Sequence, residues 1–190
     1  MDEKTEVRQQ QQLERRVAWE KEGHLEWPTQ LSTYLKPEQE LRISWILSQV
    51  EGSVLEVGCN WAYLLGRIGR GVGVDLNPEN IEIAKKLNRN LQFHVADARN
   101  LPFYNGQFDT VILPDVLEHL RWEDVSLALN EARRVSRRLL LVTLPNGDMD
   151  TGEALTMKHA WLPTMHRLVQ HFVGTDITAC GIWYFIREDQ

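Results

Sequence analysis

Four residues suited to ligand binding each stand at or just after the end of a short β-forming run. They are Gly58, Asp75, Asp97 and Asp115. A glycine between a strand and a helix lets a ligand approach backbone N–H groups at the helix N-terminus. An acid at the end of the second strand of a doubly wound fold accepts hydrogen bonds from ribose hydroxyls. Because ligands of open α/β sheets bind at the carboxyl ends of the strands, the order of these residues predicts one binding edge.

The elements that must position these residues follow from the periodicity of the chain. Segments with helical period separate the first five β-forming runs, which predicts parallel strands joined by right-handed crossovers. Two further runs lie close together around a turn and predict an antiparallel hairpin at the C-terminal end. The seven predicted strands are residues 54–57, 72–75, 91–95, 108–113, 139–144, 175–179 and 182–187.

The helical segments carry recognisable start signals and apolar faces. Asn77-Pro78 predicts a helix start, with an asparagine cap and proline at the first helical position. The next apolar helix carries Glu123 and Asp124 at its start, and we expect it to end in the arginine cluster 133–138.

Residues 1–22 are polar and glutamine-rich, and Pro37 opens a second helix. We therefore expect one α/β domain over 1–190, with a doubly wound, mostly parallel sheet in 53–190 and a helical extension in 1–50.

Composition excludes several classes of protein. The chain has 190 residues, 43% hydrophobic and 25% charged, which is normal for one globular domain. Its longest apolar run, residues 182–186, is far shorter than the ~20 residues of a membrane helix. Two cysteines and an acidic N-terminus predict a cytoplasmic protein without a signal peptide. The net charge of -6 argues against a nucleic acid partner.

The succession of motifs from Val54 to about Pro145 resembles the class I S-adenosylmethionine-dependent methyltransferases. It is most similar to the subgroup that includes the quinone-biosynthesis C-methyltransferases. Residues 54–59 (Val-Leu-Glu-Val-Gly-Cys) are similar to the first motif of the family, and residues 108–109 with 116–120 are similar to the fourth. The C-terminal hairpin resembles the reversed last strand of this fold.

The resemblance implies S-adenosyl-L-methionine as the cofactor, S-adenosyl-L-homocysteine as its product and a small molecule as the methyl acceptor. It implies that Asp75 binds the ribose and that Asp97 binds the adenine amino group, with the backbone of Ala98 on a ring nitrogen. The expected cofactor-binding residues are Glu56, Gly58, Cys59, Asn60, Asp75, Leu76, Asp97, Ala98 and Pro114.

The glycine loop departs from the family pattern. The usual Gly-x-Gly-x-Gly is Gly58, Asn60 and Ala62 here. Asparagine tolerates left-handed backbone angles better than other non-glycine residues, so we expect the loop to form. Trp61 is expected to affect the floor beneath the methionine part of the cofactor.

Asp115 and His119 are the predicted catalytic residues. Phosphoethanolamine methyltransferases carry a catalytic histidine in a similar Asp-x-x-x-His-Leu run, and an imidazole can accept a proton near neutral pH. The alternative is a structural His119 bonded to backbone. Asp115 would orient the imidazole or the acceptor.

Three further residues are substrate-contact candidates. Trp27 and Tyr34 lie in the N-terminal extension, which in this family often closes over the substrate, and His159 follows the fifth strand. The alternatives are simple packing of the extension and a solvated loop histidine. Asp115, Asn146 and Asp148 have poor spacing for metal ligands, so no metal site is predicted.

Two other functions compete with a methyltransferase. A nicotinamide-dependent oxidoreductase needs Gly-x-Gly-x-x-Gly after the first strand, and residues 58–63 lack it. A non-catalytic subunit that binds S-adenosylmethionine and regulates a partner is the second alternative, because two of the usual glycines are replaced.

Overall fold

The computed structural model describes residues 37–146, 164–173, 175–180 and 183–190. The chain forms two compact units, residues 1–40 and 41–190. Of the first unit, the described residues are those at the start of helix α3 (Pro37–Gln49). The sheet and the helices that follow α3 belong to the second unit.

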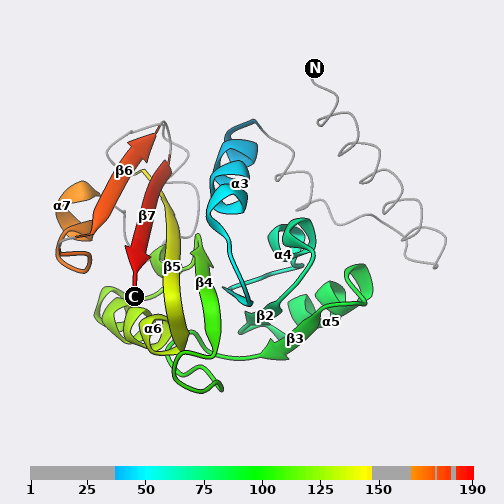
Figure 1. Cartoon of the computed structure of the whole chain (residues 1–190). Helices are drawn as coiled ribbons and strands as arrows, with labels where there is room; N and C mark the ends of the chain where they lie inside the picture. Colours follow the sequence, from blue (N-terminus) through cyan, green and yellow to red (C-terminus); the bar gives the residue numbers. More distant parts are fainter. Residues whose placement is uncertain (1–36, 147–163, 174, 181–182) are drawn as a thin grey trace. The chain divides into compact units, whose positions relative to one another are not determined.

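Within the described residues, seven strands form one sheet in the order β3-β2-β1-β4-β5-β7-β6 (Figure 1). The pairs among β1 to β5 are parallel, and β7 is antiparallel to both β5 and β6. The predicted mostly parallel α/β sheet with a reversed C-terminal hairpin is confirmed. The strands are β1 Val54–Val57, β2 Val72–Asp75, β3 Gln92–Val95, β4 Phe108–Pro114, β5 Ser136–Pro145, β6 Asp176–Cys180 and β7 Trp183–Asp189.

Helices α5 and α6 begin where the sequence predicts them. No helix forms in residues 96–107 between β3 and β4, although the sequence predicts a segment of helical period there. In α5, the Asn77 side chain accepts a hydrogen bond from the Glu79 N–H at 2.9 Å, with Pro78 at the first helical position. None of the helices in the described ranges is long and apolar enough to cross a membrane. The remaining elements are α4 Tyr63–Ile68, the 3-10 turn η1 Leu117–His119, α6 Trp122–Val135 and α7 Met165–Leu168.

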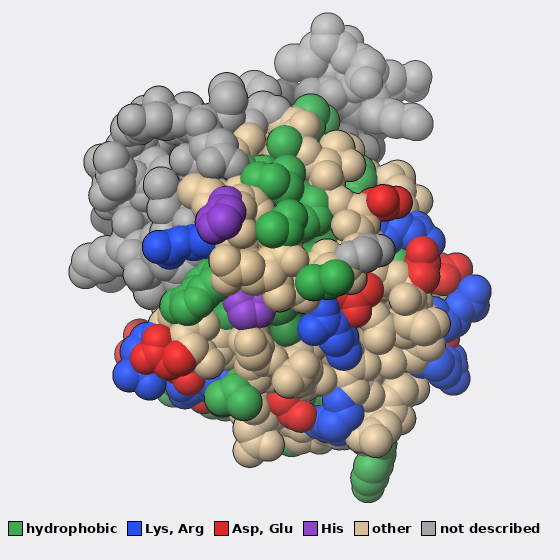
Figure 2. Space-filling view, turned by 90° about the vertical axis from the view of Figure 1, so that its left-hand side faces the viewer, with side chains coloured by type: hydrophobic (Ala, Val, Ile, Leu, Met, Phe, Trp, Pro, Cys, Tyr) green, Lys and Arg blue, Asp and Glu red, His purple; other side chains and the backbone are tan. Residues whose placement is uncertain are grey.

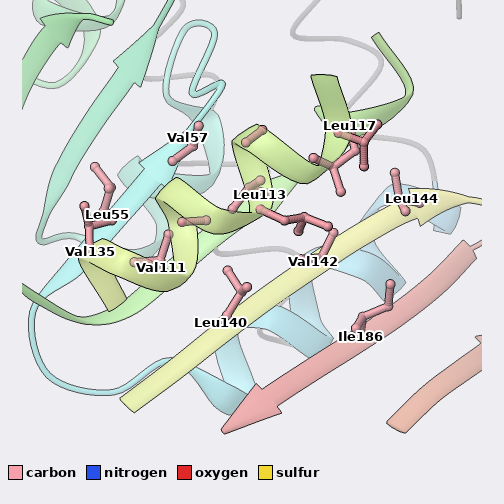
Figure 3. Packing of buried hydrophobic residues seen from close by; sticks show 14 of the residues in the cluster. Leu55, Val57, Val111, Leu113, Leu117, Val135, Leu140, Val142, Leu144 and Ile186 are labelled. Carbon is pink, nitrogen blue, oxygen red and sulfur yellow. The ribbon is translucent and has the colours of Figure 1, made fainter. Parts of the chain in front are cut away.

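The core lies between the sheet and α6 (Figure 3). All seven residues of β4 are buried, as expected for a central strand covered on both faces. Side chains alternate along β7: Tyr184 and Ile186 join the core cluster, whereas Phe185 packs against Trp45 of α3. The two ring centroids lie 5.0 Å apart. Helices α3 and α6 therefore cover opposite faces of β7.

The predicted helix end in the arginine cluster 133–138 is wrong. Helix α6 ends at Val135, so Arg137 and Arg138 belong to β5 rather than to the helix end. Pairing with β4 begins at Ser136, and this overrides the helical pattern of the sequence. His171 lies in the turn after α7, where its backbone carbonyl accepts a hydrogen bond from Arg133.

The sheet ends at the edge strand β6. Figure 2 shows this side of the molecule, where hydrophobic side chains gather beside histidines. Val169 and Val173, in the turn after α7, are 47% and 84% exposed. Strands β1 to β4, and with them the predicted ligand-binding residues, belong to the other half of the sheet.

Candidate active site

The loop between β1 and α4 forms with three residues in the left-handed region. Gly58 has a φ of 73°, Asn60 of 48° and Ala62 of 58°. The Gly58 and Cys59 N–H groups both donate to the carbonyl oxygen of Val74 at 2.8 and 2.9 Å. The loop therefore turns back over the end of β2, although two of the usual glycines are replaced.

Glu56 of β1 is a buried residue that bonds to the helix following this loop. Its side chain is 3% exposed, and Oε2 accepts a hydrogen bond from the Leu65 N–H in the first turn of α4 at 3.0 Å. Burial raises the pKa of Glu56 to about 8. The carboxyl thus joins β1 to α4. The neighbouring Cys59 is 3% exposed, and burial raises the pKa of its thiol.

Asp75 is held by three hydrogen bonds at the end of β2. Its Oδ2 accepts from the Asn60 N–H at 2.8 Å. Its Oδ1 accepts from the Asn77 N–H at 2.9 Å and from the Asn80 amide at 3.1 Å. Since a carboxylate offers about four acceptor positions, the described residues leave about one open, on Oδ2. Trp61 donates its indole N–H to the Asn80 oxygen at 3.2 Å, so the tryptophan lies beside α5.

The groups around Asp75 suit a nucleoside. The open position on its carboxylate can accept from a ribose hydroxyl. Leu76 is 66% exposed, which is unusual for a large apolar side chain and offers a surface for a flat base. Asn60 Oδ1 is buried and has no hydrogen-bond partner among the described residues. A buried acceptor without a partner indicates that a donor is missing.

Asp97 follows β3 and pairs with Arg99. The guanidinium donates to Oδ1 through Nε at 3.0 Å and to Oδ2 through Nη2 at 2.6 Å. This pairing holds the pKa of Asp97 below its usual range. On its other side Arg99 donates to Asp124 of α6 at 2.9 Å. Ala98, between Asp97 and Arg99 in the sequence, is half-buried.

Asp115 follows β4 with a φ of 55°, a rare angle for a residue with a side chain. Its N–H donates to the Thr143 carbonyl at 2.9 Å, and Pro114 before it is buried in the strand. Arg42 of α3 donates to Asp115 Oδ2 at 2.5 Å. The guanidinium also lies 4.9 Å from the centroid of the Trp183 ring. Burial raises the pKa of Asp115, and Arg42 opposes that shift.

The turn η1 places His119 and Glu118 differently. His119 is exposed and lies four residues after Asp115, at the end of η1. Glu118 is fully buried, and neither of its carboxyl oxygens has a hydrogen-bond partner in the described part of the chain. Burial and the charge of Asp115 raise the pKa of Glu118 well above its usual range.

The predicted residues that the structure describes share one sheet edge. Gly58, Asp75, Asp97 and Asp115 lie at or just after the carboxyl ends of β1, β2, β3 and β4, which are neighbours in the sheet. Trp27, Tyr34 and His159 lie outside the described residues. In the described ranges, no three histidine, cysteine or acidic side chains form a group that could hold a metal ion.

Sequence reasoning missed Arg42 and Arg99. Arg42 lies on the helix that Pro37 opens, and nothing in its local sequence indicates a partner 73 positions away. Arg99 had a weak signal, because an arginine two residues after a strand-end acid can reach back to it.

A comparison with known families adds to this geometry. Residues 55–139 match the family model of the methyltransferase domain.

The chain is also 33% identical over 125 residues to demethylmenaquinone methyltransferase of Thermotoga maritima, in an alignment covering 62% of this chain and 54% of the relative. The chain spans 22% to 54% of the length of five curated relatives that it matches.

Two solved structures share the fold. One is a Thermotoga maritima protein described as an S-adenosylmethionine-dependent methyltransferase, possible histamine N-methyltransferase. Its TM-score is 0.65 at 17% identity, with 77% of this chain and 86% of that chain covered. The other is magnesium protoporphyrin IX methyltransferase from Synechocystis PCC 6803 with bound S-adenosylhomocysteine. Its TM-score is 0.62 at 16% identity, with 80% and 81% covered. At these identities the similarity shows the fold.

Proposed function

We propose that this chain is an S-adenosylmethionine-dependent methyltransferase that methylates an oxygen, nitrogen or carbon atom of a small molecule. One observation carries the proposal: within the segment that matches the methyltransferase domain, Gly58, Asp75, Asp97 and Asp115 follow four neighbouring strands at one sheet edge. The acidic net charge of -6 supports a small-molecule acceptor over a nucleic acid.

The cofactor supplies an activated methyl group when it is bound. We assign its ribose to Asp75, whose Oδ2 has an open acceptor position, and its adenine to Leu76, Asp97 and Ala98. The loop of Gly58, Cys59 and Asn60 offers its backbone and the unpartnered Asn60 oxygen to the rest of the cofactor. Glu56 and Pro114 support the site from the buried side, Glu56 through its bond to α4.

We assign catalysis to Asp115 and His119. Methyl transfer to a hydroxyl or an amine releases a proton, and in this proposal the exposed imidazole of His119 accepts that proton. Asp115 orients the imidazole or the acceptor. Holding the nucleophile in line with the methyl group would provide much of the rate enhancement. Trp27, Tyr34 and His159 remain the candidates for acceptor binding.

The finer assignments belong to the same proposal. The identity to demethylmenaquinone methyltransferase supports the subgroup that includes the quinone-biosynthesis enzymes and a quinol-like or phenol-like acceptor. Cys59 and Cys180 are both free, in accord with a reducing cytoplasmic location.

The proposal is tested by binding and turnover together. Calorimetry with S-adenosylhomocysteine and with NAD should show binding of the first and none of the second. Radiolabelled S-adenosylmethionine should then label a member of a panel of quinols, phenols and amines, with ribosomal RNA as a separate arm. Binding of NAD alone, or labelling of RNA alone, would contradict the proposal.

A non-catalytic subunit that binds the cofactor and regulates a partner is the second candidate. The observation that favours it is the ion pair between Arg42 and Asp115, which occupies one oxygen of a predicted catalytic carboxylate. Tight S-adenosylhomocysteine binding without methyl transfer to any acceptor would favour this candidate.

A further inference from the structure

A chain of three charged residues connects the end of β3 to the first turn of α6. Asp97 pairs with Arg99, and Arg99 pairs with Asp124. Asp124 is 9% exposed and belongs to α6, so its contact with Nη1 holds the Arg99 guanidinium while Nη2 and Nε contact Asp97. Arg121, 72% exposed, also reaches Asp124 at 3.4 Å but has no contact with Asp97 among the described residues.

The hydrogen bonds of Asp97 leave its carboxylate a limited capacity. Oδ1 accepts from the Arg99 backbone N–H at 2.9 Å and from Nε at 3.0 Å. Oδ2 accepts from Nη2 at 2.6 Å and shares Nε at 3.1 Å. With about two acceptor positions on each oxygen, the described residues leave roughly one position, on Oδ2. The side chain of Asp97 is 30% exposed, so a ligand can approach it.

We propose that Arg99 is a positioning residue that makes this site specific for an adenine base. It orients the Asp97 carboxylate so that one acceptor position of Oδ2 is open to a ligand amino group. The inference rests on the proposed cofactor and on the assignment of Asp97 to its adenine. It goes beyond them by assigning base specificity to a residue that acts through Asp97.

The charge of Arg99 also fixes what Asp97 can recognise. The pairing lowers the pKa of Asp97, so the carboxylate stays ionised and only accepts hydrogen bonds. An amino group such as that of adenine can donate to it, whereas the carbonyl of hypoxanthine would face an acceptor. The charged groups on this side of Asp97 are Arg99 on its own loop and, through α6, Asp124 and Arg121. If Arg99 were neutral, Asp97 would take up a proton at a higher pH and could then donate to a carbonyl.

The test compares two ligands in three variants. S-adenosylhomocysteine and its deaminated analogue S-inosylhomocysteine are titrated calorimetrically into wild type, Arg99→Gln and Arg99→Lys. The titrations are made at about pH 7.5, well above the ordinary aspartate pKa of about 3.9, and at about pH 4.5, close to it. Arg121→Gln is the matched control, because Arg121 contacts Asp124 but not Asp97. Thermal unfolding checks that each variant is folded.

Wild type should prefer the adenine ligand at both pH values. Arg99→Gln should bind S-adenosylhomocysteine about tenfold more weakly at the higher pH, the scale of one charge-assisted hydrogen bond. Its preference for adenine should shrink further at the lower pH. Arg99→Lys keeps the positive charge but loses the paired Nε and Nη2 donors of the guanidinium, so its affinity should be intermediate and its pH profile like that of wild type. Arg121→Gln should match wild type throughout.

Several outcomes would overturn the inference. An Arg99→Gln protein with wild-type affinity, preference and pH profile would make Arg99 purely structural. If Arg99→Gln does not fold, a wild-type preference and affinity in Arg99→Lys would show that the paired guanidinium donors of Arg99 do not position Asp97. If Asp97→Ala binds S-adenosylhomocysteine as wild type does, this inference fails while the proposed cofactor stands. If wild type binds no S-adenosylhomocysteine, the proposed function fails as well.

Discussion

At the scale of single residues, Asp75 has two tasks. Its carboxylate holds the Asn60 N–H of the glycine loop and the Asn80 amide of α5, and it keeps an open position for a ligand hydroxyl. Hydrogen bonds to a charged acceptor contribute about 1.5–3 kcal/mol each. The two tasks can be separated by substituting Asp75 and Asn80 independently.

We expect Asp75→Ala to weaken S-adenosylhomocysteine binding about tenfold or more, because both the ligand bond and the loop bond are lost. Asn80→Ala removes the contact to Oδ1 and the acceptor of the Trp61 indole N–H but leaves the ligand position on Oδ2, so it should weaken binding by less. Calorimetry measures both affinities, and thermal unfolding reports the state of the fold. Equal affinities for wild type and Asp75→Ala would remove Asp75 from the site.

His119 is the second residue-scale prediction. If it accepts the acceptor's proton, His119→Ala should lower the turnover rate by ~10²–10⁴ while the affinity for S-adenosylhomocysteine is unchanged. The exposed histidine of α7, His166, provides the matched control in His166→Ala. The measurement is the rate against pH with the acceptor identified in the panel. A variant with near-normal turnover and an unchanged pH profile would make His119 structural.

The sequence could predict the residues at strand ends but not their partners. Asp75 and Asp97 are recognisable because each follows an apolar run, and parallel strands bring their ends to one edge. Arg42 is 73 residues away from Asp115, and its burial depends on how α3 packs against β7. Glu118 stands in a motif, yet only the structure shows that both of its carboxyl oxygens are buried without a partner among the described residues.

At the scale of elements, the second half of α3 is fastened to the sheet by apolar and charged contacts. Ile43 and Ile46 are fully buried, and Trp45 stacks on Phe185. Arg42, 3% exposed, adds the ion pair with Asp115. Removing one partner of a buried ion pair leaves the other charge desolvated and unpaired, which costs more than the pair itself contributes.

Arg42→Ala should therefore lower the free energy of unfolding by about 3 kcal/mol, the lower end of the range for a broken buried pair, because Asp115 is partly exposed. Combining Arg42→Ala with Asp115→Asn removes the unpaired charge and should restore part of the loss. Urea unfolding measures both, with the exposed Lys86→Ala in α5 as the control. A double variant that is less stable by the sum of the single losses would contradict this account.

Element boundaries show where local patterns fail. The helical period of α6 continues in the sequence through residue 138, but Ser136 already pairs with β4. Arg137 then pairs with Asp109 and Arg138 with Glu51, both on the side of the sheet where β4 begins. Tertiary pairing decides such a boundary, whereas the cap at Asn77 is local and was predicted correctly.

At the scale of the whole molecule, carboxyl groups with shifted pKa values set how stability depends on pH. Asp97, Asp109 and Glu131 have lowered pKa values because hydrogen-bond donors stabilise their charged forms. Arg99 donates to Asp97, the Ser53 N–H and Arg137 donate to Asp109, and Arg134 donates to Glu131. Their stabilisation is present above the unfolded pKa and is lost as the pH falls. Glu56 and Glu118 have raised pKa values through burial, and their effect has the opposite sign.

Glu56 allows that sign to be tested. Its pKa is about 8 in the folded chain against an ordinary 4.5. Its contribution is fully present below the unfolded value and is lost as the pH rises through 8, at up to about 1.4 kcal/mol per pH unit. We expect the free energy of unfolding to be greatest near about pH 5, where the lowered groups are ionised, Glu56 is protonated in the folded chain, and the loss that starts above the unfolded pKa has only begun. Glu56→Gln keeps the acceptor for the Leu65 N–H and should flatten the decline above that pH.

Urea unfolding from acid to alkaline pH measures this decline in the free energy of unfolding, with Glu79→Gln as the exposed control. A wild-type profile that is flat from pH 5 to 8, or a Glu56→Gln profile as steep as wild type, would show that Glu56 ionises in the fold as it does in water.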